Sequence, residues 1–312
     1  MTVLRESVPL TAAPTRSRRR TRSGGVFAWA LLLPTVVATA IISLYPLADT
    51  LWLSFHDTVL SGKQNGFVGL ANFSRLLSDA YFRGAWGQTI TFTVASTALE
   101  TLFGLAFALV LHQKFPLRGL VRALVLIPWA IPTVAASKMF QRLFDGQVGV
   151  VNYVLERVGL IDSYVNFLGE GSTALATIVA ADVWKTTPFM AILILAALQT
   201  IPDELRESAI VDGAGAFRRL TSIVLPMIAP AMLVAALIRA LDAFRIFDLP
   251  YTLTGGGPAG STETLSTYAY KQVFSGLQIG YGSAAITVTF ITEVLIAGIF
   301  VAFLVRQSRR LG

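Results

Sequence analysis

Residues 201–226 read Ile201-Pro-Asp-Glu-Leu-Arg-Glu-Ser-Ala-Ile-Val-Asp-Gly-Ala-Gly-Ala-Phe-Arg-Arg-Leu-Thr-Ser-Ile-Val-Leu-Pro226, and they interrupt a series of apolar segments. Seven residues from Asp203 to Arg219 are charged, whereas only 14% of the whole chain is. The pattern predicts a helix, a glycine turn and a second short helix. A polar element of this kind, set between membrane spans, is typical of a docking site for another protein.

The residues around the stretch predict where its first helix begins and ends. Thr200 can cap the helix, and Pro202 fits its first turn, where a missing N–H has no cost. Asp203 and Glu204 place negative charge near the positive end of the helix. Gly213 can adopt the left-handed conformation that ends it.

The composition indicates an integral membrane protein. The chain has 312 residues, of which 54% are hydrophobic, and its mean hydropathy is +0.65. The absence of cysteine excludes disulfides, thiolate metal sites and cysteine nucleophiles. His56 and His112 have no partner at ligand spacing, so we expect no metal site.

Apolar runs of about 20 residues predict six membrane spans. The expected spans cover roughly 26–50, 89–112, 119–142, 173–199, 224–248 and 282–305. Pro128 and Pro132 are expected to kink the third span. A short amphipathic helix is expected from Leu70 to Leu77, and a polar loop at 143–172.

Residues 1–22 hold six arginines and no apolar run, which predicts a disordered cytoplasmic tail. No charged residue follows from 23 to 48, which is longer than the core of a signal peptide, so we expect an uncleaved first span. Lys and Arg are more than twice as frequent beside the spans on the side of the two termini. The positive-inside rule therefore predicts that both termini and residues 201–226 are cytoplasmic.

Seven ionisable residues fall inside the second, fourth, fifth and sixth predicted spans, not counting the terminal residue of each span, and each costs roughly 2.5–3.5 kcal/mol there on insertion scales. They are Glu100, Asp182, Lys185, Arg239, Asp242, Arg245 and Glu293, and aromatic residues stand beside them at Trp184, Phe189, Phe244 and Phe247. Spacings of three residues allow Asp182 to pair with Lys185. The same spacing predicts a stripe of alternating charge along the fifth span.

Two interpretations of these residues remain open at this point. They could hold the helix bundle together through ion pairs. Alternatively, they could line a polar path, in which charged groups bind hydroxyls and aromatic faces stack on a ring, a combination that suits a sugar. The candidate path residues are Glu100, Asp182, Trp184, Lys185, Asp242, Phe244 and Arg245.

The motifs contain no set of catalytic residues, so we do not expect an enzyme. Gly255-Gly-Gly-Pro258 lacks the Gly-Lys-Ser/Thr end of a phosphate-binding loop. If transport uses ATP, a separate chain has to bind it.

The polar stretch resembles the EAA motif of the membrane subunits of bacterial ABC importers. That motif reads Glu-Ala-Ala, three residues, Gly, nine residues, then Ile-x-Leu-Pro. Here Glu207-Ser208-Ala209, Gly213 and Ile223-Val-Leu-Pro226 follow the same spacing, with Ser208 in place of the usual Ala. Beyond residues 1–22 the chain is similar to the permeases of maltose-type carbohydrate importers, for example at Leu253-Thr-Gly-Gly-Gly-Pro258.

The resemblance implies an all-α, six-span type I importer permease at 23–312, with its EAA loop at 201–226. It implies a second similar permease, a dimer of ATPase subunits that bind ATP and Mg²⁺, an extracytoplasmic substrate-binding (lipo)protein and membrane lipid as partners. It implies no cofactor on this chain and no nucleic acid.

The helix before Gly213 would be the coupling helix that inserts into a cleft on one ATPase. The residues expected to make this contact are Leu205, Glu207, Ser208, Ala209, Asp212 and Gly213. Leu205 and Ala209, four residues apart, would form its apolar contact strip.

The resemblance favours a disaccharide such as trehalose or maltose as the substrate. Glycerol-3-phosphate, its diesters and amino sugars are alternatives, because related permeases carry them. From a different class, an ion-coupled secondary transporter could use the charged spans as a relay. That alternative leaves the spacing in residues 201–226 unexplained.

Overall fold

The computed structural model describes residues 23–61 and 66–311, so the predicted tail at 1–22 lies outside the described residues. Within these ranges the protein is built from helices, and a lone bridge between His56 and Phe67 is the one β-type pairing. The chain divides into two compact units, with the boundary between Asp49 and Thr50.

The first unit holds the predicted first span except for its last residue. It contains α1 (Ser23–Thr39), the π-helical turn η1 (Ala40–Leu44) and the first half of α2 (Tyr45–Ser54). With the rest of α2 these segments form an apolar helix from Trp29 to Ser54 that is long enough to cross a membrane. The prediction of a span at 26–50 is confirmed.

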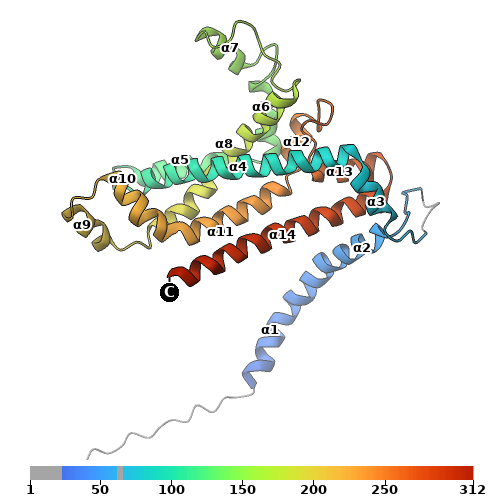
Figure 1. Cartoon of the computed structure of the whole chain (residues 1–312), viewed down its shortest axis with the longest axis horizontal. Helices are drawn as coiled ribbons and strands as arrows, with labels where there is room; N and C mark the ends of the chain where they lie inside the picture. Colours follow the sequence, from blue (N-terminus) through green and yellow to red (C-terminus); the bar gives the residue numbers. More distant parts are fainter. Residues whose placement is uncertain (1–22, 62–65, 312) are drawn as a thin grey trace, which may run out of the picture. The chain divides into compact units, whose positions relative to one another are not determined.

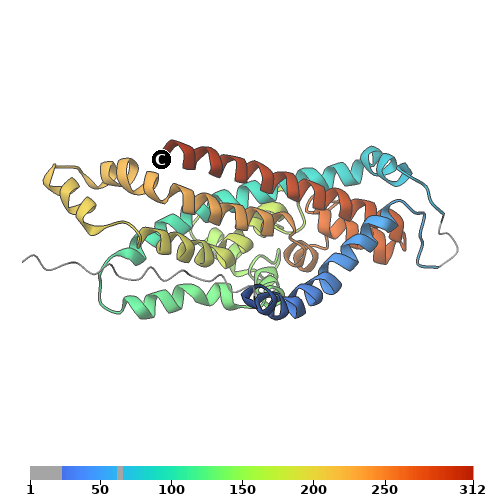
Figure 2. The ribbon, with the colours of Figure 1, turned by 90° about the horizontal axis from the view of Figure 1, so that it is seen from below.

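The second unit is a helix bundle. Its helices are α3 (Ala71–Ser78), α4 (Ala80–His112), α5 (Arg118–Ala130), α6 (Thr133–Leu143), α7 (Val150–Arg157), α8 (Gly171–Leu198), α9 (Asp203–Val211), α10 (Ala216–Arg219), η2 (Leu220–Val224), α11 (Leu225–Phe244), α12 (Asp248–Leu253), α13 (Leu265–Tyr270), η3 (Lys271–Ser275) and α14 (Ile279–Leu311). Helix α4 packs on α8, and α11 contacts α4, α8 and α14 (Figures 1 and 2). Helices α9 and α10 lie at one end of this bundle, and α3 and α13 lie at the other.

The second span begins earlier than its hydropathy suggested. Helix α4 starts at Ala80 rather than near position 89, because Asp79 caps it by accepting a hydrogen bond from the Tyr81 amide (2.8 Å). The other carboxylate oxygen accepts from the hydroxyls of Tyr268 (2.6 Å) and Tyr281 (3.1 Å). Burial favours a higher pKa for Asp79, but these hydrogen bonds hold its pKa below the usual value.

The third span is broken rather than kinked. Helices α5 and α6 meet at an angle of 88°, so the prediction of one kinked span from 119 to 142 was wrong in this respect. Ile131 adopts the extended conformation that a following proline favours, and Pro132 stands at the start of α6. The described residues contain five helices that are long and apolar enough to span a membrane, or six if this pair counts as one.

Two shorter predictions have different outcomes. The amphipathic helix expected at Leu70–Leu77 is confirmed by α3. The polar loop expected at 143–172 instead contains a helix, α7, whose Asn152 is buried and donates to the Val165 carbonyl (2.9 Å).

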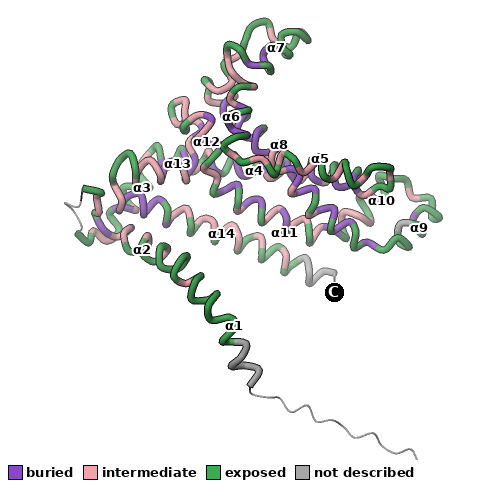
Figure 3. The backbone as a smooth tube through the Cα atoms, turned by 180° about the vertical axis from the view of Figure 1, so that it is seen from behind, coloured by how far each residue is buried: buried purple, intermediate pink, exposed green. Residues whose placement is uncertain are grey.

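Helix α8 is the most buried of the long helices (Figure 3). Its closest neighbour is α4, and Gly104 makes their approach possible. A Cβ atom at position 104 would lie 2.7 Å from Met190 Cγ and 3.2 Å from the Ala191 amide nitrogen. Small residues are the usual means by which membrane helices pack closely.

Replacing Gly104 by Val should therefore force α4 away from α8 and destabilise the bundle by about 1–3 kcal/mol. Thermal unfolding in lipid nanodiscs measures the change. Gly87→Val is the matched control, since it lies in the same helix and its added side chain would begin in open space. Equal melting temperatures for the two variants would contradict this packing.

Candidate functional site

Four charged residues form a cluster between the helices α4, α8 and α11. Arg239 of α11 is 2% exposed, and its guanidinium group donates to Glu100 of α4 and to Asp182 of α8. It also donates to Asp242, three residues along its own helix (2.7 Å). We call Glu100, Asp182, Arg239 and Asp242 the ion cluster. Thr186 adds a hydrogen bond to Glu100 (2.6 Å).

The ion cluster explains how charged side chains are tolerated inside the spans. A buried charge is stable only when it is paired and its remaining hydrogen-bonding positions are filled. The planar guanidinium group of Arg239 can serve several carboxylates at once. Glu100, Asp182 and Arg239 thus make the ion pairs that the bundle-stabilising interpretation expects. The spacing of three residues predicted that Asp182 pairs with Lys185. In the structure Asp182 is instead paired with Arg239.

A cavity of about 400 Å³ opens beside the ion cluster. Its lining residues include Trp129, Lys185, Asp242, Arg245, Phe247 and Asp248. Arg245 lies 3.9 Å from Asp242 and 3.5 Å from Glu293 of α14. The predicted stripe of alternating charge along the fifth span is thus present, and its members Arg239, Asp242 and Arg245 all line the cavity.

The cavity offers the groups that a polyhydroxylated ring requires. Carboxylates accept hydrogen bonds from hydroxyls, while the ammonium group of Lys185 and the guanidinium group of Arg245 donate to them. Trp129 provides an aromatic wall and is itself stacked on Phe189, with ring centroids 5.8 Å apart. A volume of this order is typical of small-molecule sites, which span about 300–1,000 Å³.

The candidate path residues separate into two groups. Asp182, Lys185, Asp242 and Arg245 line the cavity. Glu100 is buried behind it, and Phe244 is fully buried in an apolar cluster with Phe82 and Leu265, so neither faces it.

Trp184 lies outside the residues that line this cavity, and its ring contacts Phe140 at 5.4 Å. Sequence reasoning missed Trp129. The proline at position 132 could have pointed to Trp129, because an interrupted membrane span commonly lines a cavity.

The loop between α8 and α11 has the predicted helix, turn and short helix. Gly213 has a φ of +76°, in the left-handed region. Its amide donates to the Ile210 carbonyl (3.0 Å), and the Ala214 amide donates to the Ala209 carbonyl (2.9 Å). This pair of hydrogen bonds defines a Schellman end, which a glycine completes without strain.

Two details of this loop differ from the prediction. Thr200 does not cap α9: its hydroxyl donates to the Ala197 carbonyl (2.8 Å) at the end of α8, and Pro202 occupies the capping position. Leu205 is 43% exposed but Ala209 only 7%, so Ala209 packs inward and the expected contact strip is not formed by this pair. Glu207 and Ser208 are exposed, as are Asp212 and Gly213 at the end of the helix.

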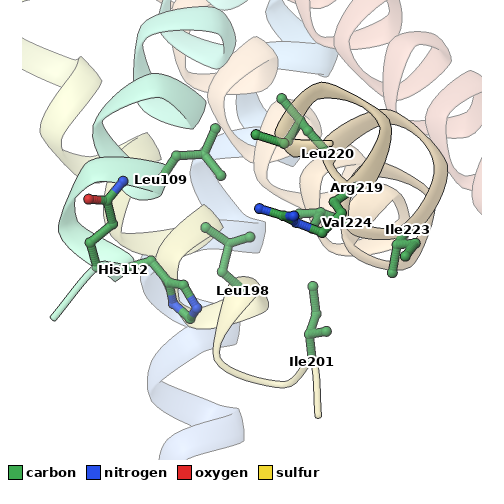
Figure 4. Close-up of a pocket in the computed structure, with 10 residues that line it drawn as sticks. Leu109, His112, Leu198, Ile201, Arg219, Leu220, Ile223 and Val224 are labelled. Atoms are coloured by element: carbon green, nitrogen blue, oxygen red, sulfur yellow. The ribbon is translucent and has the colours of Figure 1, made fainter. Parts of the chain in front are cut away.

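An apolar crevice of about 290 Å³ separates the second half of the loop from the ends of α4 and α8. Leu109, Leu198 and Val224 line it, and the guanidinium group of Arg219 points into it (Figure 4). Arg219 also donates to the Ala214 carbonyl (2.7 Å), which fixes the turn. Residues Ala216–Phe244 form one helix of 29 residues, so the loop continues directly into α11.

Residues 100–310 match the family described as binding-protein-dependent transport system inner membrane component. This match spans more than half of the chain, and the chain belongs to that family.

Two relatives and one solved structure are similar to this chain over most of its length. The chain is 42% identical over 261 residues to the trehalose/maltose transport system permease protein MalF of Thermococcus litoralis, covering 84% of this chain and 88% of the relative. It is 40% identical over 275 residues to the trehalose transport system permease protein SugA of Mycobacterium tuberculosis H37Rv, covering 88% of this chain and 87% of the relative. A subunit of a bacterial ABC transporter for the acidic polysaccharide alginate superposes with a TM-score of 0.80 at 25% identity, covering 91% of this chain and 96% of that one.

These findings confirm the predicted class. The protein is an all-α membrane subunit of an ABC transport system with the fold of importer permeases.

Replacing Arg239 by Leu should destabilise the bundle by about 3–5 kcal/mol, because it leaves Glu100 and Asp182 buried without a counter-charge. Unfolding in mixed micelles measures this change. Arg245→Leu, at an exposed position, should cost less than about 1 kcal/mol.

Neutralising both carboxylates in the Arg239→Leu background, with Glu100→Gln and Asp182→Asn, should recover part of the lost stability. If the triple variant is no more stable than Arg239→Leu alone, the unpaired carboxylates are not the cause of the lost stability.

Proposed function

We propose that this chain forms half of the path through which an ATP-driven importer carries a disaccharide such as trehalose or maltose. The observation that supports it is the cavity beside the ion cluster, where Lys185, Asp242 and Arg245 meet the aromatic wall of Trp129. The relatives named for trehalose and maltose transport favour the same substrate class.

The charges around the cavity favour a neutral sugar over a phosphate ester. Three basic residues (Lys185, Arg239, Arg245) and three acidic residues (Asp182, Asp242, Asp248) line it. Arg239 is occupied by the ion cluster, and Arg245 is close to two carboxylates. A glycerol-3-phosphate dianion would need a surplus of positive charge that these residues do not provide. The balance of charge around the cavity does not discriminate against amino sugars, so they are the second candidate substrate class.

The proposed mechanism couples the two ends of the bundle. Helix α9 would dock on one ATPase of a pair, which holds ATP and Mg²⁺, with the exposed Glu207 and Leu205 in the contact. The loop would face the cytoplasm together with both termini. A second permease would complete the path, and an extracytoplasmic binding protein would deliver the sugar. An ion-coupled secondary transporter, the alternative from another class, gives no account of the membership in a binding-protein-dependent family.

Gly213→Val should abolish uptake while the protein stays in the membrane at its normal level. A β-branched residue is strained at a φ of +76°, so the turn after α9 would be lost. Uptake of radiolabelled trehalose and co-purification of the ATPase are the measurements.

Gly215→Val is the control, because Gly215 has a φ of −63° and open space around its Cβ position. Normal transport by the Gly213→Val variant would contradict the proposed docking role of α9.

Lys185→Gln should raise the trehalose concentration for half-maximal uptake about tenfold, as expected for the loss of one charge-assisted hydrogen bond. The control Lys138→Gln removes the same charge from an exposed site on α6 and should leave uptake unchanged. If the two variants transport alike, the cavity is not the sugar site.

A further inference from the structure

Four aromatic residues, one just before α12 and the others on α12, α13 and η3, form a continuous row of contacting rings. We call Phe247, Tyr251, Tyr270 and Phe274 the aromatic strip. Phe247 stacks on Tyr251 with ring centroids 4.9 Å apart, and both contact Tyr270, at 5.1 and 5.3 Å. Tyr270 contacts Phe274 at 4.7 Å.

The aromatic strip joins the cavity to the surface. Phe247 is one of the residues that line the cavity. Next to it Tyr251 is 42% exposed, and Phe274 at the other end of the row is 62% exposed. Because α11 starts at the loop at 201–226 and ends at Phe244, the strip lies beyond the opposite end of that helix. Figure 1 shows α12 and α13 far from α9 along the bundle.

These rings differ from the aromatic residues that serve packing alone. Tyr268 stands two residues before Tyr270 on α13 and is only 3% exposed, with its hydroxyl bonded to Asp79. Tyr270 instead is half-buried within the strip. One helix therefore carries a tyrosine that fixes the fold and another that borders an accessible surface.

Charged groups border the strip, which distinguishes it from a surface facing lipid chains. Asp248 follows Phe247 directly and is exposed. Lys271 follows Tyr270 and forms an ion pair with Glu263 (2.7 Å). Exposed rings between charged residues, continuous with a polar cavity, suit an amphipathic ligand rather than an acyl chain.

We propose that the aromatic strip is a receiving subsite for the sugar, on which the apolar C–H face of a pyranose ring stacks before it enters the cavity. The polar edge of the ring stays hydrated or meets Asp248 and the Lys271–Glu263 pair. Ring faces tolerate different sugars, because stacking needs a flat apolar face and no fixed pattern of hydroxyls. This inference rests on the proposed function of sugar transport.

The test uses proteoliposomes that hold the complete transporter with its binding protein, and radiolabelled trehalose or maltose as the probe. Tyr251→Ala and Phe274→Ala should raise the half-saturation concentration for uptake about three- to tenfold, as expected for the loss of one ring contact. The conservative variants Tyr251→Phe and Phe274→Tyr keep a ring face and should transport like the parent protein. Tyr153→Ala removes an exposed ring on α7 outside the strip and serves as control.

Each outcome decides between the possibilities. Unchanged half-saturation in both alanine variants would overturn the subsite and leave the proposed function standing. A lower melting temperature together with reduced maximal uptake at constant half-saturation would mean that the rings only pack, and would also overturn it. If the parent transporter takes up neither trehalose nor maltose, the disaccharide proposal fails, and the subsite for such a ring fails with it.

Discussion

The guanidinium group of Arg239 has to be neutralised inside the membrane, and the carboxylates that do so come from three helical segments. Glu100 belongs to α4, Asp182 to α8 and Asp242 to the same helix as the arginine. Separating these helices would expose an unpaired charge to an apolar surrounding, which is among the most costly changes a bundle can undergo. Helices α4, α8 and α11 are therefore held at one fixed spacing, and the features on either side of the ion cluster depend on it.

The ion cluster lies between two different parts of the bundle. On one side of the ion cluster Asp242 and Lys185 face a cavity that the aromatic strip connects to the surface. On the other side α8 and α11 run to the loop at 201–226. Under the proposed function, this subunit would receive a push from the ATPase at α9 and respond at the cavity.

Local sequence signals predicted the elements whose causes are local. The Schellman turn at Gly213 and the span boundaries near Leu198 follow from neighbouring residues. The pairing of Glu100 with Arg239 joins positions 139 residues apart, and no spacing rule reaches that far. Hydropathy also could not tell that Phe244 faces the apolar core rather than the cavity. The sharp bend at Pro132 needed the positions of α5 and α6 in space, because a proline predicts a break more reliably than its angle.

Spin-label distances test most directly whether the ion cluster keeps α4 and α11 together during transport. The chain has no cysteine, so a single pair can be introduced at the exposed positions Val94 of α4 and Val234 of α11. In the assembled transporter, we expect one narrow distance distribution that is the same without nucleotide and with ATP bound. A distribution that shifts between the two states would contradict the account, because these helices would then move against each other across the ion cluster.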